Sequence, residues 1–266
     1  MVSKNTITGL GPIEASIVAR LTYEKKRIVT LQDFDALFRL PQKGIRQAIY
    51  RLKKKNILTP IKRGAYIFSP LEAGPGGTGV DELLIPPLFF PRKNYYVGYS
   101  TMYNYYGFTE QLFQTVYVLN TRMNRKKIIL GISYKFLKIS ENRMYGLETI
   151  KIRNAEVIIS SRERTLIDLL YFNEPVGGIN PASEVFSGVV KEKKCDIKKL
   201  VEYATRFPNI TTRKRVGVLL EGLGVSDAVL KPLIRSVQKT AVSSLNGSRA
   251  GRFDKKWRVM VDDSRR

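Results

Sequence analysis

Residues 30–68 constrain the fold of this chain more than any other stretch of the sequence. From Ile45 to Leu52, apolar residues recur at i, i+3, i+4 and i+7, which is the spacing of one buried helix face. Leu40-Pro41 separates this helix from a shorter one before it, because the residue preceding a proline disfavours the α conformation. The pattern therefore predicts two helices joined by a tight turn.

A short hairpin is predicted directly after these helices. Residues 58–61 and 65–68 are rich in β-prone side chains, and Gly64 between them supplies the positive φ that a tight turn needs. A further helix over residues 12–24 and a β-prone run over residues 27–30 come first. The order helix, strand, helix, helix, hairpin is that of a winged helix-turn-helix domain.

The second helix and the hairpin are basic, with no Asp or Glu between Pro41 and Arg63. A helix that packs on one side and carries uncompensated cations on the other has the form needed to enter the major groove of DNA. The alternative is that residues 53–55 are only a solvated helix end, where cations complement the helix dipole. We expect four residues to contact base edges: Gln42, Lys43, Arg46 and Gln47. We expect Tyr50, Arg51 and Lys54 to contact phosphates. From the hairpin, we expect the DNA backbone or the minor groove to be contacted by Lys62, Arg63 and Tyr66.

The charge of the whole chain agrees with a polyanionic partner. With 46 Lys and Arg against 23 Asp and Glu, the formal net charge is +23, which favours nucleic acid first and an anionic membrane surface second. Apolar stretches such as residues 83–91 are too short, and too broken by proline, to cross a bilayer. A polar segment rather than an apolar signal core follows Met1, so we expect a cytoplasmic protein and no membrane partner.

Residue usage removes several classes of enzyme. The chain has no histidine and one cysteine, Cys195, which excludes a Cys/His zinc site, a His-based catalytic machine and an intramolecular disulfide. We expect no cofactor, no metal, no catalytic residue and no enzymatic activity. A metal-dependent nuclease is the enzymatic alternative, but such a site needs converging acidic residues, and Glu192-Lys193-Lys194 lies in a charge run.

The length of 266 residues favours two domains. We expect a winged helix-turn-helix at residues 1–70, a linker at 71–90 and a C-terminal domain at 91–266. Glycine and proline at residues 72–80 mark the linker, and the stretch is not a phosphate-binding loop because no Lys-Ser/Thr pair follows. The aromatic residues between Tyr95 and Phe108 indicate core packing, with base stacking as the alternative.

The C-terminal domain is predicted to be a sheet over residues 91–160, helices over 161–245 and a final strand over 255–261 anchored by Trp257, so the fold class is α+β. Short connections favour largely antiparallel strands at 115–120, 127–139, 147–152 and 156–160. Ser160 and Glu163 form a predicted capping box for a helix over 162–172. Cations between Lys191 and Arg215 suggest either a second basic surface or merely solvated helical faces.

Three stretches of the sequence have the pattern of a known family: GIRQAIYRLKKKNILTPIKRGAYIF, YYVGYSTMYNYYGFTEQLFQTVYV and VIISSRERTLIDLL. The most diagnostic part is the short run Arg164-Thr165-Leu166-Ile167-Asp168, followed by Gly177-Gly178. In these residues the layout resembles the AbiEi-type antitoxins, the transcriptional-regulator half of prokaryotic type IV toxin–antitoxin systems. The resemblance covers most of the chain, including the C-terminal strand around Trp257.

The resemblance implies a repressor that binds inverted repeats in the promoter of its own operon, on double-stranded DNA. It implies a cognate nucleotidyltransferase-like toxin that is countered without an assumed direct contact, and a C-terminal domain for antitoxicity and self-association on DNA. It transfers DNA binding to Lys43, Arg46, Gln47, Arg51, Lys62 and Arg63. The remaining alternative is a winged-helix regulator whose C-terminal domain senses a ligand, with the pocket lined by the aromatic segment of residues 95–108.

Overall fold

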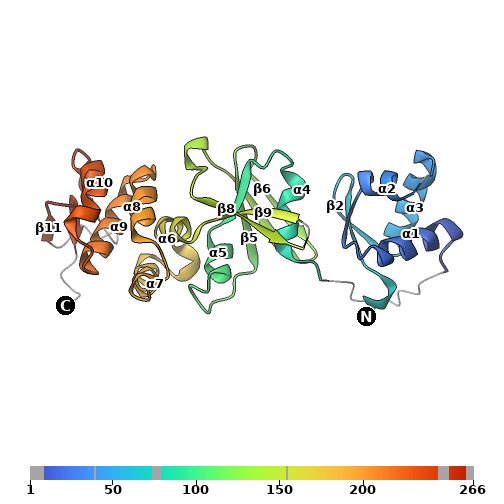
Figure 1. The fold of residues 1–266 in the computed structure, drawn as a ribbon, viewed down its shortest axis with the longest axis horizontal. Coiled ribbons are helices and arrows are strands. Elements are labelled where there is room, and N and C mark those ends of the chain that lie inside the picture. Colours follow the sequence, from blue (N-terminus) through green and yellow to red (C-terminus); the bar gives the residue numbers. More distant parts are fainter. Residues whose placement is uncertain (1–8, 39, 74–78, 154, 245–251, 262–266) are drawn as a thin grey trace. The chain divides into compact units, whose positions relative to one another are not determined.

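The computed structural model describes residues 9–38, 40–73, 79–153, 155–244 and 252–261. The chain divides into two compact units, Met1–Phe89 and Phe90–Arg266, and both contain helices and strands, so the fold class is α+β (Figure 1). Residues predicted as linker include two short 3-10 helices, η1 (Leu71–Ala73) and η2 (Glu82–Leu84), and the helix α4 (Pro86–Phe89). Residues 74–78 of that linker lie outside the described residues.

Besides η1, η2 and α4, the described part of the first unit contains a three-stranded antiparallel sheet in the order β1-β3-β2 and three further helices. Thr30 ends β1 and caps α2, accepting a hydrogen bond from the Asp33 amide. The core between sheet and helices includes Leu21, Phe34 and Leu52, none of which is exposed. The elements are α1 (Pro12–Tyr23), β1 (Ile28–Thr30), α2 (Leu31–Leu37), α3 (Gln42–Lys54), β2 (Leu58–Lys62) and β3 (Ala65–Phe68).

The hairpin of β2 and β3 has a tight turn at Arg63-Gly64, and Lys62 pairs with Ala65. Gly64 has a φ of 78°, a value that glycine adopts without a steric penalty. The carbonyl of Gly64 accepts a hydrogen bond of 3.0 Å from the amide of Leu31, so the tip of the hairpin is fixed against the start of α2.

A six-stranded sheet in the order β6-β7-β5-β4-β9-β8 forms the first half of the second unit. Three strand pairs are antiparallel, but β4 pairs parallel with β9 and β5 pairs parallel with β7. The expectation of a largely antiparallel sheet is correct only in part, because intervening segments return two strands in the same direction. The strands are β4 (Tyr95–Gly98), β5 (Thr115–Asn120), β6 (Arg125–Ile129), β7 (Ile132–Lys138), β8 (Leu147–Ile152) and β9 (Ala155–Ser160).

The single strand expected over residues 127–139 is wrong. It is the hairpin of β6 and β7, in which Ile129 pairs with Ile132. Leu130 and Gly131 between them have φ values of 50° and 79°, so both adopt the left-handed conformation of a two-residue hairpin turn. Leucine seldom adopts this conformation, so Leu130 gives no turn signal and the sequence pattern predicts one continuous strand.

Helices follow the sheet, shown in yellow to red in Figure 1. Ser161, rather than the expected Ser160, caps the first of them by accepting from the Arg164 amide, while the Ser160 hydroxyl contacts Thr165. Within the predicted helical region of residues 161–245 lie α6 (Arg162–Tyr171), α7 (Ile179–Lys191), α8 (Ile197–Arg206), α9 (Ile210–Gly222) and α10 (Asp227–Val237). The other helical segments described in the second unit are α5 (Ser100–Tyr105), η3 (Glu141–Arg143) and η4 (Glu174–Val176).

A small sheet in the order β10-β12-β11 closes the chain, built from Ser243–Ser244, Val259–Val261 and Arg252–Asp254. The expected strand over 255–261 is therefore wrong in its first half, where residues 255–258 form the turn between β11 and β12. Trp257 in this turn is completely buried, and its indole donates to the Glu221 carboxylate at 2.5 Å. Within the described part of the chain, none of the helices is long and apolar enough to span a bilayer.

Candidate nucleic-acid interface

The helix α3 separates its residues into a buried and an exposed face. Ile45, Ala48, Ile49 and Leu52 are buried, as the spacing of the apolar residues predicts. The outer face carries the residues expected to contact DNA, and no acidic residue lies in the helix. All of them are exposed on α3: Gln42, Lys43, Arg46, Gln47, Tyr50, Arg51 and Lys54.

Contacts along this face order two of its long side chains. The Arg46 guanidinium donates to the Gln42 side-chain carbonyl at 3.3 Å, one turn earlier. The Lys54 ammonium lies 4.9 Å from the centroid of the Tyr50 ring, which is a cation–π contact. These contacts leave most hydrogen-bond donors of the two cations unused, so they remain available to bases or phosphates.

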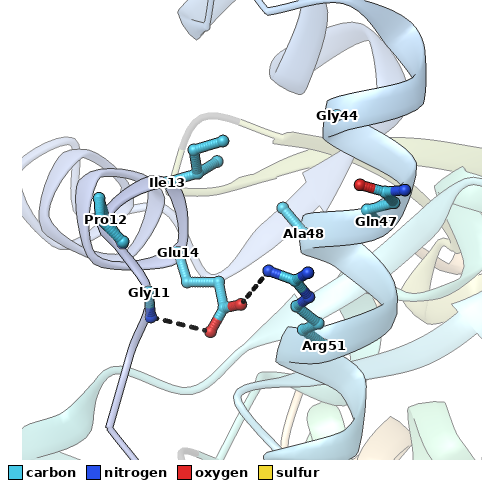
Figure 2. Close-up of a pocket in the computed structure, with 8 residues that line it drawn as sticks. All are labelled: Gly11, Pro12, Ile13, Glu14, Gly44, Gln47, Ala48 and Arg51. Carbon is cyan, nitrogen blue, oxygen red and sulfur yellow. Dashed lines mark hydrogen bonds and ion pairs between the residues drawn. The ribbon is translucent and has the colours of Figure 1, made fainter.

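A buried carboxylate that sequence reasoning missed joins α1 to the end of α3. Glu14 is 2% exposed, and its carboxylate lies 2.5 Å from the Lys55 ammonium and 3.5 Å from the Arg51 guanidinium. It also accepts from the Gly11 amide at 3.4 Å (Figure 2). The Lys55 hydrogen bond, with help from the Gly11 amide and the charge of Arg51, lowers the pKa of Glu14 against the opposing effect of burial.

The Arg51 guanidinium pairs with the Glu14 carboxylate, and the Arg51 side chain stays exposed. A hollow of about 110 Å³ lies beside it, lined among others by Gln47, Ala48 and Arg51 of α3 and by Gly11 and Pro12 of α1 (Figure 2). A space of this size holds a few water molecules rather than a ligand. Its position links the start of α1 to the exposed face of α3.

The hairpin contributes fewer exposed cations than expected. Arg63 is exposed at the turn, whereas Lys62 is half-buried and its ammonium lies 5.9 Å from the centroid of the Phe89 ring. Tyr66 is also half-buried and packs edge-on against Phe34, with ring centroids 6.5 Å apart. Arg63 is therefore the exposed cation of the hairpin, and the Tyr66 ring packs against Phe34.

The cations between Lys191 and Arg215 do not form one surface. Lys191, Lys193, Lys194, Lys198 and Lys199 are exposed, but Lys214 is completely buried. Its ammonium donates to the carbonyls of Ala241 and Arg258 and contacts the Ser243 hydroxyl. Arg213 and Arg215 donate to backbone carbonyls of Phe207 and Leu170. All three cations of α9 therefore donate to oxygen atoms of the protein, and Arg213 and Arg215 are half-buried.

Most of the aromatic segment of residues 95–108 is core, in agreement with the packing interpretation, whereas Tyr105 is 48% exposed. Tyr95, Tyr96, Tyr99 and Tyr103 are at most 3% exposed. Burial raises the pKa of Tyr95 to about 12, with a smaller opposing effect from its hydrogen bond with the Ile158 amide.

Acidic residues considered for metal-dependent chemistry have structural partners. Asp168 pairs with Arg164 at 3.2 Å, and both side chains are completely buried. Glu163 accepts from the Asp196 amide, and Glu192 pairs with Lys194. Among the described residues, no three His, Cys, Asp or Glu side chains lie close enough together to hold a metal ion.

Comparison with known proteins gives a fold and no function. No family model matches the chain, and no curated protein matches it. The structure is similar to the crystal structure of the Rv2827c protein from Mycobacterium tuberculosis, with a TM-score of 0.61 and 14% sequence identity. The match covers 97% of this chain and 94% of that one, so the two proteins share their overall fold.

Proposed function

We propose that the first unit is a winged helix-turn-helix domain that binds double-stranded DNA, with α3 as its recognition helix. The observation that carries this proposal is the outer face of α3, where exposed cations and amides lie together on a helix without acidic residues. The helix pair α2 and α3 followed by the hairpin of β2 and β3 has the order of such domains.

In this proposal the two halves of α3 have different roles. Gln42, Lys43, Arg46 and Gln47 lie in the first half, which meets base edges, where Arg pairs with guanine and Gln with adenine. Tyr50, Arg51, Lys54 and the hairpin residue Arg63 contact phosphates, and Lys62 does so only by leaving its place beside Phe89. Since Glu14 holds Arg51 and Lys55 near α1, it positions phosphate contacts without touching DNA.

We further propose that the protein represses its own operon as the antitoxin of a type IV toxin–antitoxin system. The support is the resemblance of its sequence stretches to AbiEi-type antitoxins and a net charge of +23 that suits a DNA ligand. The second unit, with its six-stranded sheet and helices, then counters a nucleotidyltransferase-like toxin and mediates self-association on DNA.

A binding experiment tests the DNA proposal. The full chain is titrated into labelled upstream DNA and into a shuffled duplex of equal composition, at several salt concentrations. We expect tighter binding to the upstream DNA and a logarithmic affinity that falls linearly with the logarithm of salt concentration, by about 0.9 for each phosphate contacted. Equal affinity for both duplexes contradicts sequence-specific recognition, and affinity that is independent of salt contradicts phosphate contacts.

The antitoxin proposal has its own test. The chain is co-expressed with the protein encoded beside its gene, and cell growth is followed. Growth arrest by the neighbouring protein alone, and recovery when the chain is present, are the expected results. Arg46→Ala is a substitution on the proposed DNA surface, so growth recovery that persists in this variant separates toxin neutralisation from repression. The antitoxin role is contradicted if the neighbouring protein does not arrest growth, or if the chain does not restore it.

A further inference from the structure

A hollow lies in the second unit, whereas the surface proposed to bind DNA belongs to the first. It has a volume of about 270 Å³ and is lined by Arg143, Tyr171, Phe207, Pro208 and Asn209. These residues come from three places in the chain: the end of η3, the end of α6 and the short connection between α8 and α9. The volume exceeds the roughly 150 Å³ of a cavity that holds benzene, so a small organic molecule fits.

Arg143 is the charged group of the hollow, and its neighbours hold it in place. Its guanidinium donates to the Tyr99 hydroxyl at 2.9 Å and lies 4.7 Å from the centroid of the Tyr171 ring and 5.4 Å from that of Phe207. The side chain is half-buried, and its Nε has no hydrogen-bond partner. A guanidinium held between aromatic rings is a preorganised receptor for a carboxylate or phosphate.

More cations than carboxylates surround this hollow. The Arg164 guanidinium lies 5.2 Å from the Phe207 centroid, and Arg213 donates to the Phe207 carbonyl. Asp168 is the carboxylate whose charge acts on Arg143, and its direct ion pair is with Arg164. Within the described residues, neither Arg143 nor Arg213 forms an ion pair. Because Arg143 and Arg213 are partly buried and have no direct ion pair in the described part of the chain, an anion placed here is stabilised.

The start of α9 adds to the positive potential. Asn209 is exposed and caps this helix of 13 residues, accepting from the Thr212 amide at 2.9 Å. The partial positive charge of a helix N-terminus therefore lies at the rim formed by Pro208 and Asn209. The apolar part of the lining comes from Tyr171, Phe207 and Pro208.

We propose that this hollow binds a small organic oxyanion, with its carboxylate or phosphate group on Arg143 and its apolar part against Tyr171 and Pro208. The site is independent of the proposed DNA surface, and it makes the second unit a ligand-binding unit. The apolar lining favours an anion that carries a small ring over inorganic phosphate, since burial of apolar surface adds to the charge interaction.

Calorimetric titration of the full chain at constant ionic strength tests the site. The probes are benzoate, phenyl phosphate, inorganic phosphate and benzamide, which has the ring of benzoate without its charge. We expect saturable one-to-one binding of benzoate or phenyl phosphate, about tenfold tighter than that of inorganic phosphate, and none of benzamide. The tighter of the two ring compounds identifies the anionic group. Binding of benzamide as tight as that of benzoate overturns the proposal, as does the absence of saturable binding.

Asn209→Asp is the most discriminating variant. Aspartate caps a helix as well as asparagine does, so the melting temperature is expected to be unchanged, while the new charge at the rim repels an anion. We expect the affinity for the oxyanion to fall about tenfold or more. Gln32→Glu, on an exposed position of α2 in the first unit, makes the same change of net charge and serves as the control.

Two further variants complete the test. Arg143→Lys keeps the positive charge but loses the paired N–H donors of the guanidinium. We expect the oxyanion to bind more weakly, with little change in the number of sites. Arg46→Ala, on the DNA-facing surface, is expected to leave oxyanion binding unchanged. Equal losses in Asn209→Asp and Gln32→Glu show that the protein attracts anions only through its net charge, which overturns the proposed site without affecting the proposal of DNA binding.

Discussion

Glu14 in the first turn of α1 and Lys55 directly after α3 form an ion pair with an N–O distance of 2.5 Å, although 41 positions separate them in the sequence. Both side chains are largely shielded from solvent, with 3% and 17% of their surfaces exposed. This contact connects the first helix of the chain to the end of the proposed recognition helix. It is the basis of the first two predictions.

Glu14→Gln is expected to lower the free energy of unfolding by about 1–3 kcal/mol, because it removes the charge that satisfies a shielded ammonium. Urea denaturation of the full chain measures this change. Glu24→Gln is the control, since Glu24 pairs with Arg20 in the same helix but both side chains are more exposed. Exposed pairs contribute less than about 1 kcal/mol, so similar losses in the two variants contradict the special role of Glu14.

The stability of the first unit is expected to fall in acid. The pKa of Glu14 lies below its ordinary value of 4.5 in the folded protein, so the unfolded chain binds the proton more readily. The stabilisation is therefore complete above pH 4.5 and is lost as the pH falls through the lowered pKa. Denaturation curves at several pH values are expected to show a smaller acid-induced loss for Glu14→Gln than for the native chain.

Arg46→Ala is expected to weaken binding to the specific DNA by about 1–3 kcal/mol and to relax preference at one base pair. Arg63→Ala is expected instead to weaken binding to all duplexes alike and to reduce the salt slope by about one. Competition experiments with single-base variants of the upstream DNA measure both effects. An exposed cation outside the proposed surface, Arg20, provides the control, and an equal effect of Arg20→Ala assigns the loss to net charge alone.

Gly217→Ala is expected to destabilise the second unit by about 1–3 kcal/mol through overpacking. A Cβ atom at this position lies 2.1 Å from the buried Trp257 ring, so α9 and the turn before β12 have to separate. Gly188 in α7 has open space around a Cβ atom, and alanine there is expected to stabilise the helix by about 0.5–1 kcal/mol. Thermal unfolding followed by tryptophan fluorescence distinguishes these opposite changes.

Asp168→Ala is expected to cost about 3–5 kcal/mol, because it leaves the completely buried Arg164 without its carboxylate. The double variant Arg164→Met, Asp168→Leu is expected to lose less than the single one, since no buried charge remains unpaired. Denaturant titration of both variants is the measurement. A double variant that is less stable than Asp168→Ala shows that the hydrogen bonds of Arg164 to the Arg143 and Tyr145 carbonyls contribute more than its charge costs.

Regular amphipathic patterns were sufficient to predict several elements. The apolar spacing from Ile45 to Leu52 leads to the observed helix α3, and Gly64 leads to the observed hairpin turn, because both depend on residues less than two turns apart. Local patterns failed where a residue adopts a conformation that its type disfavours. Leu130 has a positive φ, so the turn between β6 and β7 has no sequence signal apart from Gly131.

Contacts between distant segments were not predictable from the chain alone. The buried position of Lys214 depends on the carbonyls of Ala241 and Arg258, which lie beside the strands of the small C-terminal sheet. In the same way, the half-buried position of Lys62 depends on the Phe89 ring. From sequence alone a cationic residue is expected to be exposed, because the residues that bury it are distant in the sequence.

The sequence by itself determined the basic character of the chain, the absence of histidine, and the apolar face of α3 opposite its cations. These properties depend on composition and on spacing along a single helix. Only the tertiary structure decided that Glu14 holds the end of α3 and that Arg143 faces a hollow with Tyr171 and Asn209. The physical reason is that burial, ion pairing and cavities are properties of side chains brought together from separate segments, and packing rather than local spacing determines which segments meet.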